Sequence, residues 1–216
     1  MSASRPIQIS YDGLARVDGS ARFSFGDTVA LASVSGPIEV RLAAELPSQA
    51  TFDVSVRPLS NVPSTESKSQ AATIRSAIAP SLILNKNPRT LIQLVIQTLT
   101  LALLNAGSVP MRGVVCAIAI GKTRDGELLV DPEEARVAEL IQGGCFAFMV
   151  ADGAGLESNS TTVWTNWRAL EGTFDETGLM SAREAAKDAI KRVYTSMKSS
   201  LMPERIGHGD DDKMEI

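Results

Sequence analysis

VDGSARFSFGDTVALASVSGP, residues 17–37, is the stretch that decides the fold, because turn signals divide it into short strand-like segments. Phe23 and Phe25 alternate with polar residues, which is typical of a strand with one apolar face. Gly26-Asp27 can take the positive-φ positions of a tight hairpin turn. We therefore expect a β-hairpin here, with residues 28–35 as a return strand buried on both faces.

Turn signals also flank this hairpin. Asp18-Gly19 predicts a turn that leads in from a preceding strand at residues 13–17. Gly36-Pro37 predicts the end of the sheet. Strands joined in quick succession by tight turns form an antiparallel meander, so the sequence opens with one sheet.

Further strands and helices follow the meander. A helix is predicted at residues 71–84, where Ile74, Ile78 and Leu82 lie four apart and Pro80 would kink the last turn. A polar loop is expected at residues 60–69. Strands are predicted at residues 50–57, 89–98, 114–120 (ended by Gly121), 127–130, 145–150 and 161–164. Strands, a helix, more strands and a final helix make an α+β layout.

The final helix has the strongest pattern. Ser181 with Glu184 predicts a capping box at its start. An apolar stripe at helical spacing follows, made of Ala182, Ala185, Ala186, Ala189, Ile190, Val193 and Met197. The opposite side carries Lys187, Lys191, Arg192 and Lys198, which we interpret as a solvated face, with a nucleic-acid patch as the alternative.

Residues 91–104 pass from strand-like to helix-like sequence without a turn residue between them. A strand does not usually join a helix without a connection of a few residues. Either the strand is really helical, or residues are missing from this sequence near Leu99-Thr100.

Composition narrows the functional classes. The chain has 216 residues, a net charge of −4 and 44% hydrophobic residues, which fits one large domain or two small ones. It lacks a signal-like apolar start and any run of about 18 apolar residues, so we expect a soluble intracellular protein. The acidic balance argues against strong stand-alone nucleic-acid binding, although a local basic patch is compatible with it.

Few residues of this chain are suited to metal or histidine chemistry. Cys116 and Cys145 lie in apolar surroundings and are expected to be buried reduced thiols. His208 is the only histidine and lies in a polar stretch, so neither a histidine base nor a His-rich metal site is expected.

Several motifs in order resemble the RNase PH family. They are ARVDGSARFSFGDTVALASVSGPIE (15–39), NPRT (87–90), NAGSVPMRGVVCAIAIGK (105–122) and LLVDPEEARV (128–137). The resemblance covers about residues 13–201, and within the family it is greatest to eukaryotic RNA exosome ring subunits of the group similar to the archaeal catalytic subunit. It implies a split β-α-β fold like that of ribosomal protein S5 domain 2, with mixed sheets packed on helices.

The resemblance also implies an organisation and a setting. We expect one RNase PH-like domain at residues 1–202 and a disordered acidic tail at residues 203–216. Such chains form a hexameric ring with other RNase PH-like subunits, bind S1/KH cap proteins and associated nucleases, and pass RNA through a channel. That implies a role in RNA and rRNA processing and degradation in the nucleus, the nucleolus and the cytoplasm, without a membrane or a cofactor.

The family's enzymes use phosphate to release the last 3′ nucleotide, which needs donors for phosphate and a carboxylate for acid catalysis or metal binding. The family's phosphate loop lies between the Pro-Arg-Thr strand and the next helix; here that strand joins TLALLNAG directly, and no such loop is present. Its acidic pair falls on Ile141-Gln142-Gly143, and its basic pair falls on Thr65-Glu66. Asp131 matches a family aspartate, which we interpret as a strand-end turn rather than a leftover catalytic group. We therefore expect no catalytic residues, unless a loop is missing near Leu99.

Candidate RNA contacts follow from the same resemblance. They are Lys86 and Arg89, beside the Pro-Arg-Thr motif, with Arg75 and Lys68 near the first helix. Arg75 is better explained by a helix–sheet salt bridge, and Trp164 and Trp167 by packing or an interface. Two rival functions stay open: an active phosphate-dependent 3′–5′ exoribonuclease, and an S5-like protein- or RNA-binding scaffold outside the exosome.

Overall fold

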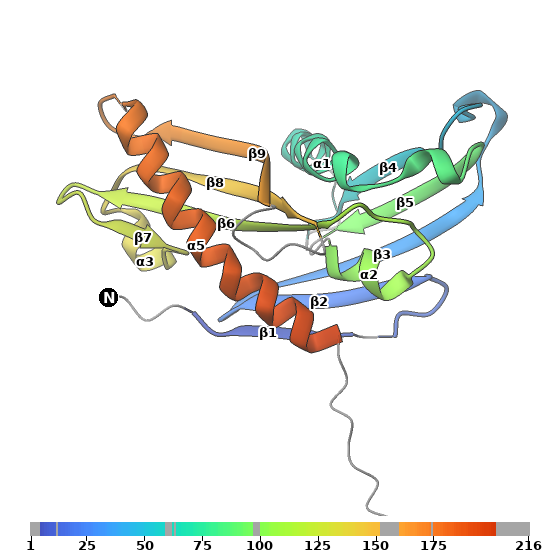
Figure 1. The fold of residues 1–216 in the computed structure, drawn as a ribbon, viewed down its shortest axis with the longest axis horizontal. Helices are drawn as coiled ribbons and strands as arrows, with labels where there is room; N and C mark the ends of the chain where they lie inside the picture. The colour runs from blue at the N-terminus through green and yellow to red at the C-terminus, as the bar shows by residue number, and fades with distance from the viewer. Residues whose placement is uncertain are drawn as a thin grey trace, which may run out of the picture.

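Two β-sheets and the helices packed on them make up the computed structural model of this chain (Figure 1). The structure describes residues 5–11, 13–58, 62, 64–96, 100–151, 160–173 and 175–201. A single cluster of buried apolar side chains draws on both sheets and on the last helix. Within the described residues, no helix is both long and apolar enough to cross a membrane. The α+β layout expected from the sequence is confirmed.

The first sheet has five strands in the order β1-β2-β3-β5-β4. All neighbours are antiparallel except β4 and β5, which run parallel because helix α1 lies between them in the chain. The bounds are β1 Ile7–Ser10, β2 Gly19–Phe25, β3 Thr28–Glu39, β4 Thr51–Val56 and β5 Thr90–Ile96.

The predicted hairpin is present, since β2 pairs with β3 around Gly26 at φ 54°. The predicted preceding strand at residues 13–17 is wrong: the strand that pairs with β2 is β1, and Arg16 sits in a turn at φ 67°. Gly36-Pro37 does not end the sheet either. Strand β3 continues through a register shift there, where the Asp18 carboxylate accepts a hydrogen bond from Gly36 N at 2.7 Å.

Burial on β3 also differs from expectation. Ala32 and Val34 are fully buried, while Ser33 between them is only half-buried, so one face is covered rather than both. Strand β4 agrees with its prediction, with Phe52 and Val54 on the buried face.

Helix α1, Thr65–Ile78, begins six residues before its predicted start. Ser64 explains the difference, because its hydroxyl accepts a hydrogen bond from Ser67 N at 3.2 Å and caps the helix inside the predicted polar loop. Pro80 lies in the 3₁₀ turn Ala79–Ser81 that follows the helix.

Both elements at the suspected gap are formed. Residues 90–96 are strand β5, so the alternative that this segment is helical is wrong, and helix α2 spans Thr100–Ala106. Residues 97–99, which connect them, lie outside the described residues.

The second sheet is antiparallel, with four strands in the order β7-β6-β8-β9. Strand β6 continues past Gly121, where the side chain of Leu140 packs so closely that a Cβ would lie 2.6 Å from it. Three of these strands are longer than predicted. The bounds are β6 Val114–Thr123, β7 Leu128–Val130, β8 Leu140–Val150 and β9 Ser160–Ala169, with the short helix α3 at Glu134–Val137.

Helix α5, Glu176–Leu201, runs diagonally from the four-stranded sheet to β1 (Figure 1). The predicted apolar stripe is confirmed, with Ala182 and Ile190 among its buried members. The predicted capping box is wrong, because the helix begins earlier: Asp175 Oδ1 accepts a hydrogen bond from Gly178 N, and Ser181 Oγ donates to Thr177 O inside the helix.

Cysteine chemistry agrees with the sequence. Both thiols are free, Cys116 fully buried and Cys145 half-buried. Burial raises the pKa of the Cys116 thiol to about 12, which keeps it protonated and unreactive near neutral pH.

Helix α2 contacts β2 and β3 of the first sheet and β6 of the second. Leu101, Ala102 and Leu103 are almost completely buried. Gly19 at the start of β2 permits the contact, because a Cβ there would lie 2.6 Å from Ala102 O. Asn105 then donates from Nδ2 to Ser20 O at 2.9 Å.

Gly19→Ala should therefore destabilise the fold by about 2 kcal/mol or more, because the backbone of α2 cannot yield to an added methyl group. Urea unfolding measures the effect. Gly13→Ala is the matched control, since a Cβ at Gly13 meets nothing within 4 Å. Equal stability of the two variants would contradict the close contact between α2 and β2.

Candidate functional site

Asp131 follows β7 with a left-handed backbone, at φ 52°, and its side chain is 6% exposed. Arg5 binds both carboxylate oxygens, with Arg5 Nε 2.8 Å from Oδ2 and Nη2 on Oδ1. Arg5 also donates to Thr28 Oγ1 at 3.1 Å, so this ion pair joins the first sheet to the second. The hydrogen bonds that Arg5 donates to Asp131 raise the pKa of Arg5. Asp131 is thus a strand-end turn, as interpreted from the sequence, and also a structural anchor.

The predicted position of the family's acidic pair, residues 141–143, lies inside β8. Gln142 is 5% exposed and donates from Nε2 to Thr173 O at 3.1 Å, while its Oε1 has no hydrogen-bond partner among the described residues. Ile141 O accepts hydrogen bonds from Leu170 N and Glu171 N. Gly143 has no side chain. None of these residues supplies a carboxylate for proton transfer or metal binding.

Helix α2 begins where the family's phosphate loop would end. Its first residue, Thr100, is 4% exposed, and its hydroxyl donates to Val115 O at 2.6 Å. The hydroxyl is therefore engaged by the protein itself. The predicted absence of a phosphate loop concerns residues 97–99, which lie outside the described residues.

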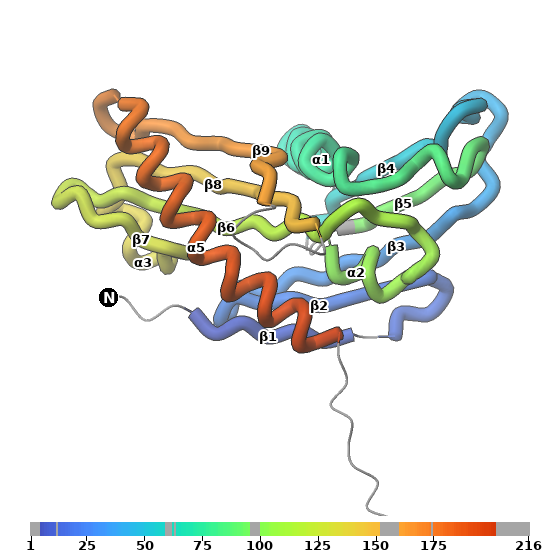
Figure 2. The backbone as a smooth tube through the Cα atoms, viewed as in Figure 1, coloured from blue at the N-terminus to red at the C-terminus, as the bar shows by residue number. Residues whose placement is uncertain are grey.

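The predicted RNA-contact residues do not form one cluster. Lys68 and Arg75 are exposed on α1, beside the end of β4. Lys86 and Arg89 lie at the start of β5, which Figure 2 shows at the opposite end of the first sheet. The sequence motif places Lys86 and Arg89 close together, but it cannot show that α1 lies so far from them.

The predicted RNA-contact residues also differ in their surroundings. Arg89, at φ 60°, forms an exposed ion pair with Glu45 at 3.3 Å. Arg75 makes no ion pair with any described residue, so its predicted helix–sheet salt bridge is not found there. At the predicted basic pair, Glu66 places a negative charge in the first turn of α1, which disfavours phosphate.

Arg112 lies in the quoted motifs but was not predicted as a site residue. Arg112 is exposed, and its backbone N–H donates to Ser81 O at 2.7 Å, next to the 3₁₀ turn after α1. Its place in the Pro-Met-Arg motif was the only sequence signal for it. Trp167 packs on Phe146 with ring centroids 5.8 Å apart, as expected for a packing residue.

No group of acidic, histidine or cysteine side chains among the described residues could hold a metal ion. The described site thus combines a buried ion pair, a buried amide and dispersed surface cations. Such cations can contact a polyanion without sequence preference.

Comparison with known protein families identifies the class of fold. The RNase PH family model, described as the 3′ exoribonuclease family, domain 1, matches residues 3–123, which is more than half of the chain. The chain belongs to the RNase PH family.

Particular relatives extend the similarity over nearly the whole chain. The exosome complex component RRP46 of Saccharomyces cerevisiae is 26% identical over 89% of this chain and 93% of the relative. The exosome complex component Rrp41 of Nitrosopumilus maritimus is 32% identical over 96% of this chain and 89% of its own length. The crystal structure of rice (Oryza sativa) Rrp46 has the same fold, with a TM-score of 0.79, 24% identity and coverage of 92% and 95%.

Asp131→Asn should lower the free energy of unfolding by about 2 to 3 kcal/mol, because it leaves the Arg5 charge without its partner. Asparagine tolerates the left-handed backbone at this position, so strain does not add to the effect. Chemical denaturation measures it, with Asp125→Asn in an exposed turn as the control. If Asp131→Asn were as stable as the control, the ion pair would not anchor the two sheets.

Proposed function

We propose that this chain is a non-catalytic structural subunit of an RNA exosome ring that supports 3′–5′ RNA processing and degradation. Relatives named as exosome components match it over almost their full length. The proposal therefore rests on membership of the family and on the side chains of the candidate site.

The observation that carries the proposal is the absence of a usable carboxylate. Phosphorolysis requires an acid or a metal-binding carboxylate near the leaving oxygen, and the two positions where the family resemblance places these carboxylates hold Ile141 and Gly143, neither of which is acidic. Asp131, the remaining family aspartate, has both oxygens bound by Arg5. A carboxylate held in a buried ion pair is a poor proton donor or metal ligand.

Exposed apolar side chains support assembly with partner subunits. Leu42 is 89% exposed, with Ile38 and Leu46 partly exposed at the same end of the first sheet. Such groups favour an interface over free solvent. We propose other RNase PH-like chains as ring neighbours, with S1/KH cap proteins and associated nucleases as further partners, in the nucleus, the nucleolus and the cytoplasm.

We further propose that Lys68, Arg75, Lys86 and Arg89 contact RNA phosphates. All four are exposed, and their separation along the surface suits an extended strand better than a compact ligand. Of the four, Arg89 is the one held by an ion pair, with Glu45, so we expect its contribution to be the smallest.

The alternative with a specific observation in its favour is an active phosphate-dependent 3′–5′ exoribonuclease. The family model is that of 3′ exoribonucleases, and the segment where a phosphate loop would lie, residues 97–99, falls outside the described residues. An S5-like scaffold outside the exosome is the other alternative, and it would purify without ring partners.

Native mass spectrometry of the tagged protein from its own cells distinguishes these functions. A particle of many different subunits is expected, whereas a ring of identical copies favours the enzyme.

The same material is then given an RNA oligomer with inorganic phosphate. The amount of nucleoside diphosphate released should be the same for Asp131→Asn as for the original chain, in a particle that still assembles. A loss of release would contradict the non-catalytic assignment.

RNA contacts can be tested through salt dependence. Replacing Arg75 and Lys86 by Ser in the assembled particle should lower the slope of log affinity against log salt by about 0.7 for each phosphate of single-stranded RNA that these side chains neutralise. Lys187→Ser with Arg192→Ser on α5 is the matched control. If only the α5 variant changed the slope, the alternative nucleic-acid patch on the last helix would be correct.

A further inference from the structure

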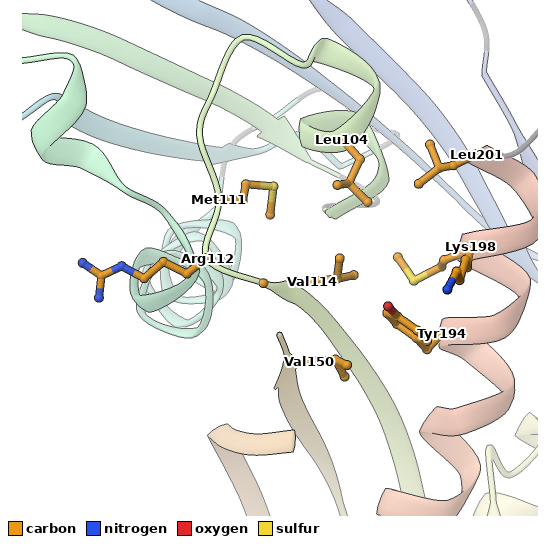
Figure 3. A pocket seen from close by; sticks show the side chains of 10 residues that line it. Leu104, Met111, Arg112, Val114, Val150, Tyr194, Lys198 and Leu201 are labelled. Atoms are coloured by element: carbon orange, nitrogen blue, oxygen red, sulfur yellow. The ribbon is translucent and has the colours of Figure 1, made fainter. Parts of the chain in front are cut away.

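A groove lies beside the last turns of α5, on the opposite side of Met111 from the exposed end of Arg112 (Figure 3). Its volume is about 460 Å³, which is large enough for several side chains. Apolar groups make up most of the lining, supplied by Leu104, Met111, Val114, Val150, Met197 and Leu201. The groove shares Arg112 with the site described above.

The charged side chains that line the groove are positive. Lys198 and Arg112 line it, and no carboxylate does. Figure 3 shows Lys198 beside Tyr194 at the groove, whereas the Arg112 guanidinium points away from it. Lys198 is exposed and forms no ion pair with the described residues. The last turns of α5, from Ala189 to Leu201, contain no acidic residue, although the chain as a whole is acidic. The groove therefore favours an occupant that is both apolar and acidic.

The chain itself continues from this point with such a sequence. Leu201 lines the groove, and the residues that follow read MPERIGHGDDDKMEI. Pro203 cannot continue the helix without losing a backbone hydrogen bond. Ile206 provides a branched apolar side chain, and Asp210 to Asp212 provide adjacent carboxylates.

The length of this segment is sufficient. Tyr194 and Leu201 are separated by about 10 Å along the helix axis, at about 1.5 Å per residue. The five residues from Leu201 to Ile206 span up to about 16 Å when extended, at about 3.3 Å per residue. Ile206 can therefore reach any part of the groove, and the aspartates that follow can reach Lys198.

We propose that the groove binds the chain's own residues 203–216, with Ile206 among the apolar lining groups and Asp210–Asp212 against Lys198. A tethered segment has an effective concentration of about millimolar, so weak contacts are enough to occupy the groove. A separate partner peptide would need greater intrinsic affinity to displace it, because it loses translational freedom on binding. An RNA strand fits less well, since the lining is mostly aliphatic and offers few cations.

Methionine methyl NMR tests this directly in the full chain. Met111 and Met197 line the groove. Met180, in the first turns of α5, lies about 20 Å along the helix from Tyr194, the first residue of α5 that lines the groove. The full chain is compared with a chain that ends at Leu201. Met111 and Met197 should resonate at different positions in the two proteins, and Met180 should not move, which also shows that both are folded.

Charge variants define the contact further. In a Lys198→Glu background, the difference between the full and shortened chains at Met111 and Met197 should largely disappear. Lys187→Glu on the same helix is the matched control and should preserve it. Asp210→Asn, Asp211→Asn and Asp212→Asn together should have the effect of Lys198→Glu without shortening the chain.

A synthetic peptide of residues 203–216, added at millimolar concentration to the shortened chain, should move both resonances toward their full-chain positions. Identical spectra for the full and shortened chains would overturn the proposal. So would a difference that persisted through both the Lys198→Glu and the aspartate variants, or resonances that moved only on addition of an RNA oligomer or a ring partner. These readings do not depend on nuclease activity or on ring assembly.

Discussion

The contact between helix α2 and the first sheet is the constraint on which the rest of the structure depends. Each sheet has an apolar face, and the short helix α2 contacts strands of both, as the longer helices α1 and α5 also do. It can do so only because Gly19 carries no side chain where the backbone of Ala102 and Ala106 approaches. The hydroxyl of Thr100 and the amide of Asn105 then satisfy backbone carbonyls of β6 and β2, so the buried helix leaves those polar groups paired.

Much of this architecture was predictable from local sequence. Alternation at Phe23 and Phe25 identified the hairpin, and the stripe from Ala182 to Met197 identified the last helix, because these patterns record which face is buried. Helix starts were less predictable. Ser64 and Asp175 cap their helices before any apolar periodicity begins, and the capping-box pattern at Ser181 occurs inside a helix.

The candidate site was predictable only in part. Motif order was enough to indicate the family, which the family model confirms, and to predict which acidic positions differ. It could not reveal that Arg5 holds Asp131, because the two residues are 126 positions apart in the chain. Nor could it show that α1 and the start of β5 lie at opposite ends of the sheet, which separates cations that the sequence had grouped together. Long-range packing decides such relations, and no local pattern encodes them.

The two ends of the described chain meet, and this has a consequence for how the protein forms. Tyr11 and Ser200 share a hydrogen bond of 2.8 Å, and Arg5 reaches a residue beyond the middle of the chain. Contacts between such distant positions require large loops to close before they stabilise anything, which slows folding. Strand β1 therefore cannot acquire its final contacts until α5 has been synthesised. During translation, the first sheet would emerge from the ribosome with one border still uncovered, at the stage when association with another unfinished chain is easiest.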